Sequence, residues 1–328
     1  MPQQRNNTFG FWAGIAFTLV IAGIGTELSG LPVVNRIGPM LASILLAVLY
    51  RNFVGYPEPL RTGIQFSGQR ILRLAIILFG FKLNVDVILH KGLTLLVHDV
   101  VTIVLAIAAT MLIARLIKAE EKMSLLLGIG TGVCGAAAVA AVSPIIEANE
   151  EDTAISVGII ALMGTIFALA YAALRPYLPL SPEMYGIWTG ISLHEIAHVA
   201  AAAGPAGQNA LAVALLAKLG RVFLLIPLSF VLSWWARRRG GQSTQRAPFP
   251  WFLVGFVITS LIGTYLPIPK VLLTEVSTAA SFLLAAAMVG LGLNVHLSHL
   301  RSRALRPLAA MTVASVILSV VSYLTLGL

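Results

Sequence analysis

Residues 186–204 read GIWTGISLHEIAHVAAAAG, and residues 209–227 read NALAVALLAKLGRVFLLIP. Both stretches are apolar, and each approaches the roughly 20 residues that a helix needs to cross a bilayer. Yet each carries ionisable residues near its middle. A charge at the centre of a spanning helix costs about 2.5–3.5 kcal/mol on insertion scales, so such residues are functional by default. This pattern predicts a membrane protein with a polar site inside the membrane.

The composition of the whole chain agrees with this interpretation. Of its 328 residues 58% are hydrophobic and 11% are charged, against about 25% charged in a soluble domain. The mean hydropathy is +0.91. These values exclude a soluble enzyme, a disordered chain and a nucleic-acid-binding protein. The single cysteine, Cys134, excludes an intramolecular disulfide and a cysteine-rich metal site.

The chain reads as a series of apolar segments separated by short loops. We expect an all-α polytopic protein of about eleven transmembrane helices, forming a single transmembrane domain over residues 1–328 without a soluble domain. The predicted spans cover residues 9–28, 37–55, 71–89, 94–114, 123–145, 153–174, 184–203, 208–236, 249–267, 275–297 and 304–327.

Basic residues in the loops predict the orientation. With the N-terminus in the cytoplasm, 16 of the 22 Lys and Arg residues fall inside, Arg175 among them, and two lie within a span. The remaining four fall outside, and they are Arg36, Lys82, Lys91 and Lys270. An odd number of spans places the C-terminus outside, and it also places the acidic stretch from Glu147 to Asp152 there.

Two internal echoes suggest an inverted repeat, a common plan in transporters. Residues 74–85 (LAIILFGFKLNV) resemble residues 284–295 (LAAAMVGLGLNV), and these two predicted spans run antiparallel. Residues 128–132 (GIGTG) resemble residues 186–190 (GIWTG), but as full spans they would run parallel and could not be an inverted pair.

The cations of the eighth span predict an anion site. Lys218 and Arg221 are three residues apart and share a helix face, and Lys218 lies about 15 Å from the nearer end of the span. Glu195 can neutralise one of them, which leaves one positive charge in the membrane for a permeating anion to balance. The alternatives are a snorkelling Arg221 or a structural pair of Lys218 with Glu195. His194 and His198 are four apart and would share one helix face, with Glu195 next to it, and these three residues would respond to protonation.

The fifth span is rich in glycine and predicts a helix break near the middle of the membrane. Such a break leaves a half-helix N-terminus that points at a bound anion. The alternative is an ordinary helix interface of small residues. The candidate substrate-binding residues here are Gly130, Thr131, Gly132, Cys134 and Gly135.

The stretch HEIAH at 194–198 also matches the H-E-x-x-H motif of zinc proteases, in which two histidines hold the metal. Zinc needs a third protein ligand. No Asp follows Asp152 in this chain, and the chain contains no Asp-Gly pair. An intramembrane zinc protease is therefore a minor alternative, and we predict no metal site.

The order of these motifs resembles one known family. GVCGAAAVAAVSPIIEA at 132–148, GIWTGISLHEIAHVAAAAG at 186–204 and AKLGRV at 217–222 look like the YeiH family of bacterial inner-membrane proteins, over essentially the whole chain. The resemblance implies a fold similar to sodium–bile acid symporters and cation–proton antiporters, with inverted repeats and broken crossing helices. The family is usually labelled as sulfate exporters, which implies small sulfur oxyanions as substrates. The positions that match its motifs are Cys134, Gly135, Ala136, His194, Glu195, Lys218 and Arg221.

The sequence therefore predicts a secondary transporter of small anions. The family resemblance alone implies the export of sulfate or sulfite. It would work by alternating access with proton coupling. A sodium-coupled organic-anion transporter is the alternative. We expect no enzymatic activity, no cofactor and no nucleic-acid partner, and the sequence leaves a homo-oligomer open. The expected partners are a small anionic solute and the lipid bilayer.

Overall fold

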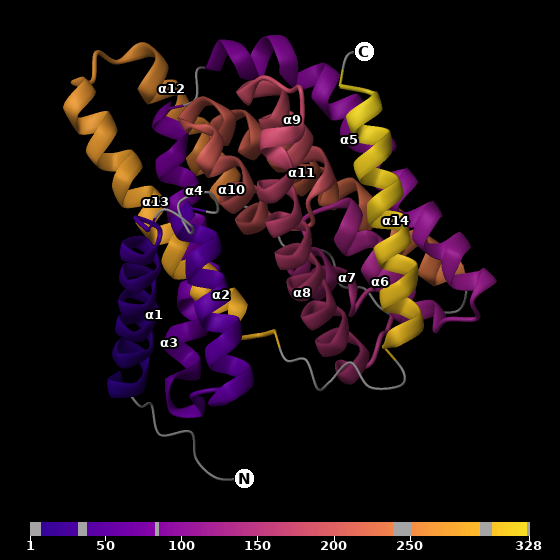
Figure 1. The fold of residues 1–328 in the computed structure, drawn as a ribbon. Helices are drawn as coiled ribbons and strands as arrows, with labels where there is room; N and C mark the ends of the chain where they lie inside the picture. The colour runs from indigo at the N-terminus through magenta and orange to yellow at the C-terminus, as the bar shows by residue number, and fades with distance from the viewer. Residues whose placement is uncertain (1–7, 32–37, 83–84, 239–250, 296–303, 327–328) are drawn as a thin grey trace.

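The computed structural model describes residues 8–31, 38–82, 85–238, 251–295 and 304–326. These residues form helices and connecting loops, with no strand among them, as Figure 1 shows. The all-α prediction is confirmed. Of the basic residues that predicted the orientation, Arg5, Arg36, Arg239, Arg246, Arg301 and Arg303 lie outside the described residues.

Six helical segments among the described residues are long and apolar enough to cross a membrane. They are α1 (Thr8–Leu28), the part Val97–Leu116 of α5 (Val85–Leu116), α8 (Glu150–Leu174), α11 (Gln208–Arg238), α13 (Lys270–Gly292) and α14 (Leu305–Leu324). Shorter apolar helices accompany them, among them α2 (Gly38–Phe53) and α12 (Trp251–Tyr265). A further rod joins α3 (Arg61–Phe66), a π-turn over Ser67–Ile71 and α4 (Leu72–Phe79). This rod begins ten residues before the third predicted span.

The fifth predicted span folds back on itself instead of crossing. It consists of α6 (Glu121–Gly132) and α7 (Ala136–Val142), separated by a break where glycine allows it. Lys122 Nζ donates to the carbonyl oxygen of Glu147 at 2.8 Å, so both ends of the segment lie together. A straight helix between these two residues would separate them by about 37 Å. We call α6 and α7 the first hairpin.

The seventh predicted span folds back in the same way. It consists of α9 (Pro182–Ser192) and α10 (Ile196–Ala203). Tyr185 Oη donates to the carbonyl oxygen of Ala202 at 3.4 Å, which brings the start of α9 next to the end of α10. We call α9 and α10 the second hairpin.

The two hairpins enter from opposite ends of the bundle. The first hairpin finishes just before α8 begins, and the second lies at the other end of α8, where Arg175 Nη1 donates to the carbonyl oxygen of Pro205 at 2.6 Å. We define the N-side as the end where α14 begins at Leu305 and the C-side as the end where it finishes at Leu324. Arg306 Nη1 donates to the carbonyl oxygen of Lys118 at 3.2 Å, which places the base of the first hairpin on the N-side.

This arrangement corrects three expectations. The count of eleven crossing helices is not confirmed, because two of the segments are hairpins. Glu147 lies on the same side as Lys122, and Arg175 lies on the opposite side, so the predicted positions of Glu147 and Arg175 relative to Lys122 are wrong. The physical reason is that each hairpin returns the chain to the side that it left.

The hairpins also change the interpretation of the second sequence echo. Residues 128–132 end α6 and residues 186–190 lie near the end of α9. Because the hairpins enter from opposite sides, these two helices run in opposite directions and form an inverted pair after all. In α6, a Cβ at Gly132 would lie 3.1 Å from Ile103 Cα of α5. In α9, a Cβ at Gly190 would lie 2.5 Å from the carbonyl oxygen of Ala214 in α11. In both repeated stretches, glycine therefore allows close packing against a long helix.

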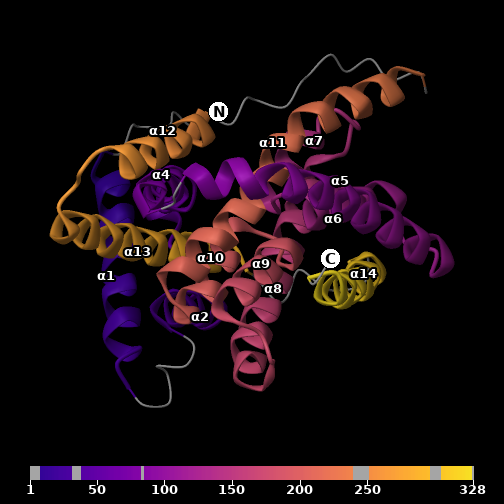
Figure 2. The ribbon, with the colours of Figure 1, turned by 90° about the horizontal axis from the view of Figure 1, so that it is seen from above.

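The helices form two groups that lie side by side in both views (Figures 1 and 2). We call α1 to α4 with α12 and α13 the panel, and α5 to α11 with α14 the hairpin group. Within the panel, a Cβ at Gly290 of α13 would lie 2.9 Å from the backbone nitrogen of Gly68, which is why glycine occupies this helix crossing. The prediction of a single transmembrane domain stays a prediction.

Candidate functional site

The tips of the two hairpins meet at Glu195. Its Oε1 accepts a hydrogen bond from the backbone nitrogen of Ala136, the first residue of α7, at 2.9 Å. Gly135 just before it has φ +81°, a conformation that favours glycine, and a Cβ there would overlap the Glu195 side chain. The sequence thus places a carboxylate of the second hairpin on the broken helix of the first.

Arg221 donates hydrogen bonds to the C-terminal ends of α6 and α9, one helix from each hairpin. It projects from α11 and is fully buried. Nη1 donates to the carbonyl oxygen of Gly132 in the first hairpin at 3.3 Å, and Nη2 donates to Gly190 in the second at 2.8 Å and also to Ile191. Carbonyl groups at a helix C-terminus carry partial negative charge and have no partner in their own helix. The buried guanidinium group therefore caps two half-helices.

Lys218 acts one turn away on the same face of α11. It is fully buried, and its Nζ donates to the carbonyl oxygen of Leu193, in the break of the second hairpin, at 2.6 Å. Lys218 and Arg221 both reach the second hairpin, as expected of two residues on one face of α11, and their predicted role in binding an anion stays a prediction. No solute is needed to give these two cations a partner, because backbone carbonyls already provide one.

Asp99 of α5 is the counter-ion of Arg221. Arg221 Nε donates to its Oδ1 at 3.1 Å, and the aspartate is 1% exposed. The prediction that Glu195 neutralises one of the two cations stays open for Lys218, because the salt bridge of Arg221 is with Asp99. With both histidines neutral, Lys218 and Arg221 balance Asp99 and Glu195, so the described cluster has no surplus positive charge. Asp99 was not among the predicted site residues, although a carboxylate in an apolar segment is itself a signal.

His194 and His198 face different partners, which contradicts the prediction that they share one helix face. His194 lies in the break before α10, where its Nε2 is 2.8 Å from Ser315 Oγ of α14. His198 lies inside α10, with Nε2 3.3 Å from Thr165 Oγ1 and Nδ1 3.3 Å from Glu195 Oε2. A zinc-protease motif needs both histidines on one helix, and the break at 193–195 removes that geometry. Among the residues that the structure describes, no group of three His, Cys, Asp or Glu side chains is placed to hold a metal.

Several buried polar atoms at the hairpin tips lack a hydrogen-bond partner. They are Thr131 Oγ1, His194 Nδ1, Asp99 Oδ2, Glu195 Oε2 and His198 Nδ1, of which the last two lie 3.3 Å apart. A buried polar group without a partner is destabilising by about 1–3 kcal/mol. Such atoms at one place in a membrane are therefore candidates for contact with a solute.

Gly130 and Cys134, which were also predicted to bind the substrate, are packed against protein atoms. A Cβ at Gly130 would overlap Ile160 and crowd Val139, so this glycine lets the arms of the first hairpin and α8 approach each other. Cys134 is buried in the break between α6 and α7. The predicted break near Gly130–Gly135 is therefore where the structure has it.

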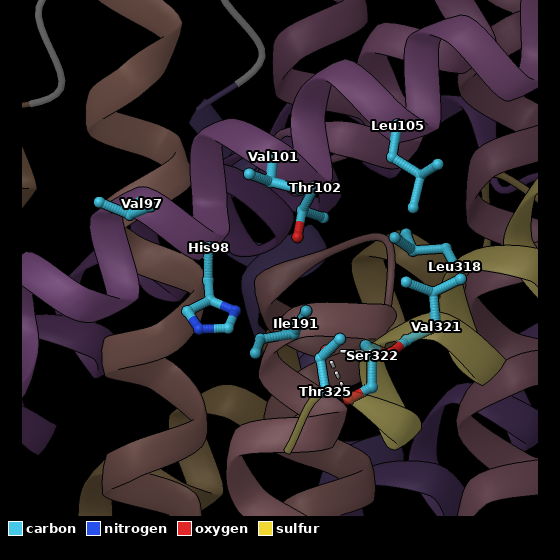
Figure 3. Close-up of a pocket in the computed structure, with 10 residues that line it drawn as sticks. All are labelled: Val97, His98, Val101, Thr102, Leu105, Ile191, Leu318, Val321, Ser322 and Thr325. Carbon is cyan, nitrogen blue, oxygen red and sulfur yellow. Dashed lines mark hydrogen bonds between the residues drawn. The ribbon is translucent and has the colours of Figure 1, made fainter. Parts of the chain in front are cut away.

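A separate groove of about 170 Å³ lies between α5 and α14, with one residue of α9 at its floor (Figure 3). Its lining residues are Val97, His98, Val101, Thr102, Leu105, Ile191, Leu318, Val321, Ser322 and Thr325. None of the buried charged residues lines it. The groove is mainly apolar, and we do not include it in the candidate site.

The comparisons with known proteins agree with a membrane protein. A family profile described as "Conserved hypothetical protein 698" matches residues 13–311. A UPF0324 membrane protein of Staphylococcus aureus strain MRSA252 is 46% identical over 316 residues, which cover 96% of each chain. A UPF0324 membrane protein of Staphylococcus epidermidis is 48% identical over the same length and share. The resemblance seen in the motifs is confirmed, and the chain belongs to the UPF0324 family of membrane proteins.

Proposed function

We propose that the protein is a secondary transporter of small anions that works by alternating access. The observation that carries the proposal is the hydrogen bond from the Ala136 backbone nitrogen to Glu195 Oε1, 2.9 Å long and buried between the hairpin tips. The Glu195 carboxylate accepts from a backbone amide at the start of a helix, a position where an anion is stabilised. A solute anion that displaced it would meet backbone amides at the starts of α7 and α10, with Thr131 and His194 nearby.

Glu195 also offers a means of coupling to protons. When Glu195 is protonated, its negative charge is lost and its hold on the Ala136 amide weakens. A solute anion then enters without repulsion from the carboxylate. Proton binding and anion binding favour each other, and His198, 3.3 Å from Glu195 Oε2, is placed to exchange the proton.

Lys218 and Arg221 support this site indirectly. Their donors bond to the carbonyl oxygens of Leu193, Gly132 and Gly190, so they hold the tips in shape and supply positive potential. We do not assign them direct contact with the solute in this conformation.

Alternating access would come from movement of the hairpin group against the panel. All six buried charged or histidine residues of the site belong to the hairpin group. They are Asp99 in α5, His194 and Glu195 in the break before α10, His198 in α10, and Lys218 and Arg221 in α11. The panel contributes none of them. A rigid shift of the hairpin group would carry the whole site across the membrane while its contacts stay intact.

The proposal includes sulfite and sulfate as first candidate solutes, a bacterial inner-membrane location and a cytoplasmic N-terminus. Loop cations support this orientation, since Arg115, Lys118, Lys122 and Arg306 gather on the N-side, against Arg175 and Lys270 on the C-side. We propose no enzymatic activity and no cofactor.

Flux in proteoliposomes tests the proposal. We expect uptake of radiolabelled sulfite or sulfate that increases when an imposed pH gradient supplies protons on the side of the solute. Glu195→Gln keeps an oxygen that accepts from Ala136 but removes the titratable group, so flux should no longer follow the gradient. Glu27→Gln, at an exposed position of α1, is the matched control. Absence of flux for these anions and for a panel of sulfonates and organic acids would refute the anion proposal.

A further inference from the structure

The backbone carbonyl groups at the hairpin tips are already occupied by cations of the protein. In sodium-coupled transporters, the carbonyl oxygens of broken helices coordinate the coupling ion. Here Lys218 Nζ lies 2.6 Å from the Leu193 carbonyl oxygen. Arg221 binds the carbonyl oxygens of Gly132, Gly190 and Ile191.

The formal charges lead to the same conclusion. A coupling cation enters a membrane site where negative charge is uncompensated. The described cluster contains two carboxylates, Asp99 and Glu195, and two fixed cations, Lys218 and Arg221, all at most 5% exposed. No negative charge remains for a sodium ion to neutralise. The ammonium group is a compact point charge with three donors, which makes it a closer substitute for a metal cation than a guanidinium group is.

We propose that Lys218 and Arg221 are tethered replacements for a coupling cation, so that the transport cycle does not use sodium. The proposal rests on the proposed transport function and decides between its proton-coupled and sodium-coupled forms. It further assigns the Leu193 carbonyl oxygen as part of a cation position that Lys218 fills. Removal of the ammonium group would leave this oxygen unpaired and the cluster with one surplus negative charge.

The first test measures flux of the wild-type protein with sodium, potassium or choline as the only monovalent cation. We expect rates that agree within about twofold across the three media. A tenfold or greater loss of flux without sodium would overturn the inference and leave the transporter proposal intact. Absence of flux in every medium would count against the transporter proposal, and the second test then decides the inference.

The second test needs no solute. Thermal unfolding of the detergent-solubilised protein is followed in NaCl and in KCl at equal ionic strength. The wild type should unfold at the same temperature in both salts. Lys218→Gln should unfold a few degrees higher in NaCl than in KCl, because an ion that binds only the folded state stabilises it. Lys218→Arg, which keeps a cation, and Lys270→Gln, at an exposed position, should show no difference.

Two outcomes of the second test would contradict the inference. One is a sodium-specific stabilisation of the wild type, which would show that the cation position is free. The other is a folded Lys218→Gln protein that does not distinguish the two salts. If this variant does not fold, the wild-type comparison in both tests still decides.

Discussion

Arg221 donates from Nε to Oδ1 of Asp99 at 3.1 Å, across 122 positions of the chain. The pair joins α11 to α5, while the other nitrogen atoms of the same guanidinium group bind the C-terminal ends of α6 and α9. One buried side chain therefore connects two spanning helices and both hairpins. This explains how two short half-helices keep their place in a region where every backbone group needs a protein partner.

The Asp99→Asn variant tests the strength of this connection. The amide still accepts from Arg221 but leaves its charge uncompensated. Loss of one partner of a buried ion pair costs about 3–5 kcal/mol. We expect a marked fall in the unfolding temperature in detergent and a lower yield of folded protein. Arg61→Ala breaks the exposed pair of Arg61 with Glu58, which lie 2.6 Å apart, and should change the unfolding temperature far less. Equal changes for both variants would show that the buried pair is not the connection we describe.

The sequence predicted the break of the first hairpin because its cause is local. Gly135 adopts a positive φ, and glycine does so without the strain that other residues incur. The reversal of the chain after the break has no such local signal, since a hairpin and a crossing helix have the same apolar composition. The loop-charge rule could not detect it either. Each hairpin returns the chain to the side that it left, so Glu147 and Arg175 exchange their predicted sides relative to Lys122.

The position of Asp99 relative to the helix ends explains why it was not among the predicted site residues. The predicted fourth span began at residue 94, which made Asp99 a residue near the membrane edge. In the structure α5 begins at Val85, so Asp99 lies fourteen residues into a 32-residue helix. The carboxylate is buried against Arg221 of α11, a contact between distant parts of the chain that hydropathy does not reveal. A pattern of hydropathy fixes the existence of a helix more firmly than its ends.

Chemical labelling tests the two hairpins directly. With Cys134→Ala as background, single cysteines are introduced at Lys122, Glu147, Arg175 and Ala206. An impermeant thiol reagent should label the first two positions from one side of the membrane and the last two from the other. Eleven crossing helices predict the opposite result, because Lys122 and Glu147 would then lie on different sides. The native Cys134 is buried and should react slowly from either side.

Gly135→Ala tests the contact between the hairpin tips. Its φ of +81° is strained for alanine, and the added methyl group would overlap the Glu195 side chain. Such a position costs about 1–3 kcal/mol, so we expect a lower unfolding temperature and a loss of flux. Gly158→Ala in α8, where a Cβ would meet no atom within 4 Å, should be neutral or stabilising by up to about 1 kcal/mol. If the two variants behave alike, the tip does not need glycine.

Thr131→Val separates stability from transport. Thr131 Oγ1 is buried without a hydrogen-bond partner, although the residue lies one position before the Gly132 carbonyl group that Arg221 binds. Valine has the same shape and removes the unpaired hydroxyl group, so the folded protein should be as stable as the wild type or more stable, by about 1 kcal/mol. If the hydroxyl group contacts the solute, flux should fall and the apparent KM should rise in the same variant. Thr110→Val is the control, because Thr110 Oγ1 donates to the Ala106 carbonyl oxygen at 2.7 Å within α5 and should affect neither measurement strongly. A Thr131→Val protein that is stable and transports normally would remove Thr131 from the site and confine solute contact to the backbone amides and His194.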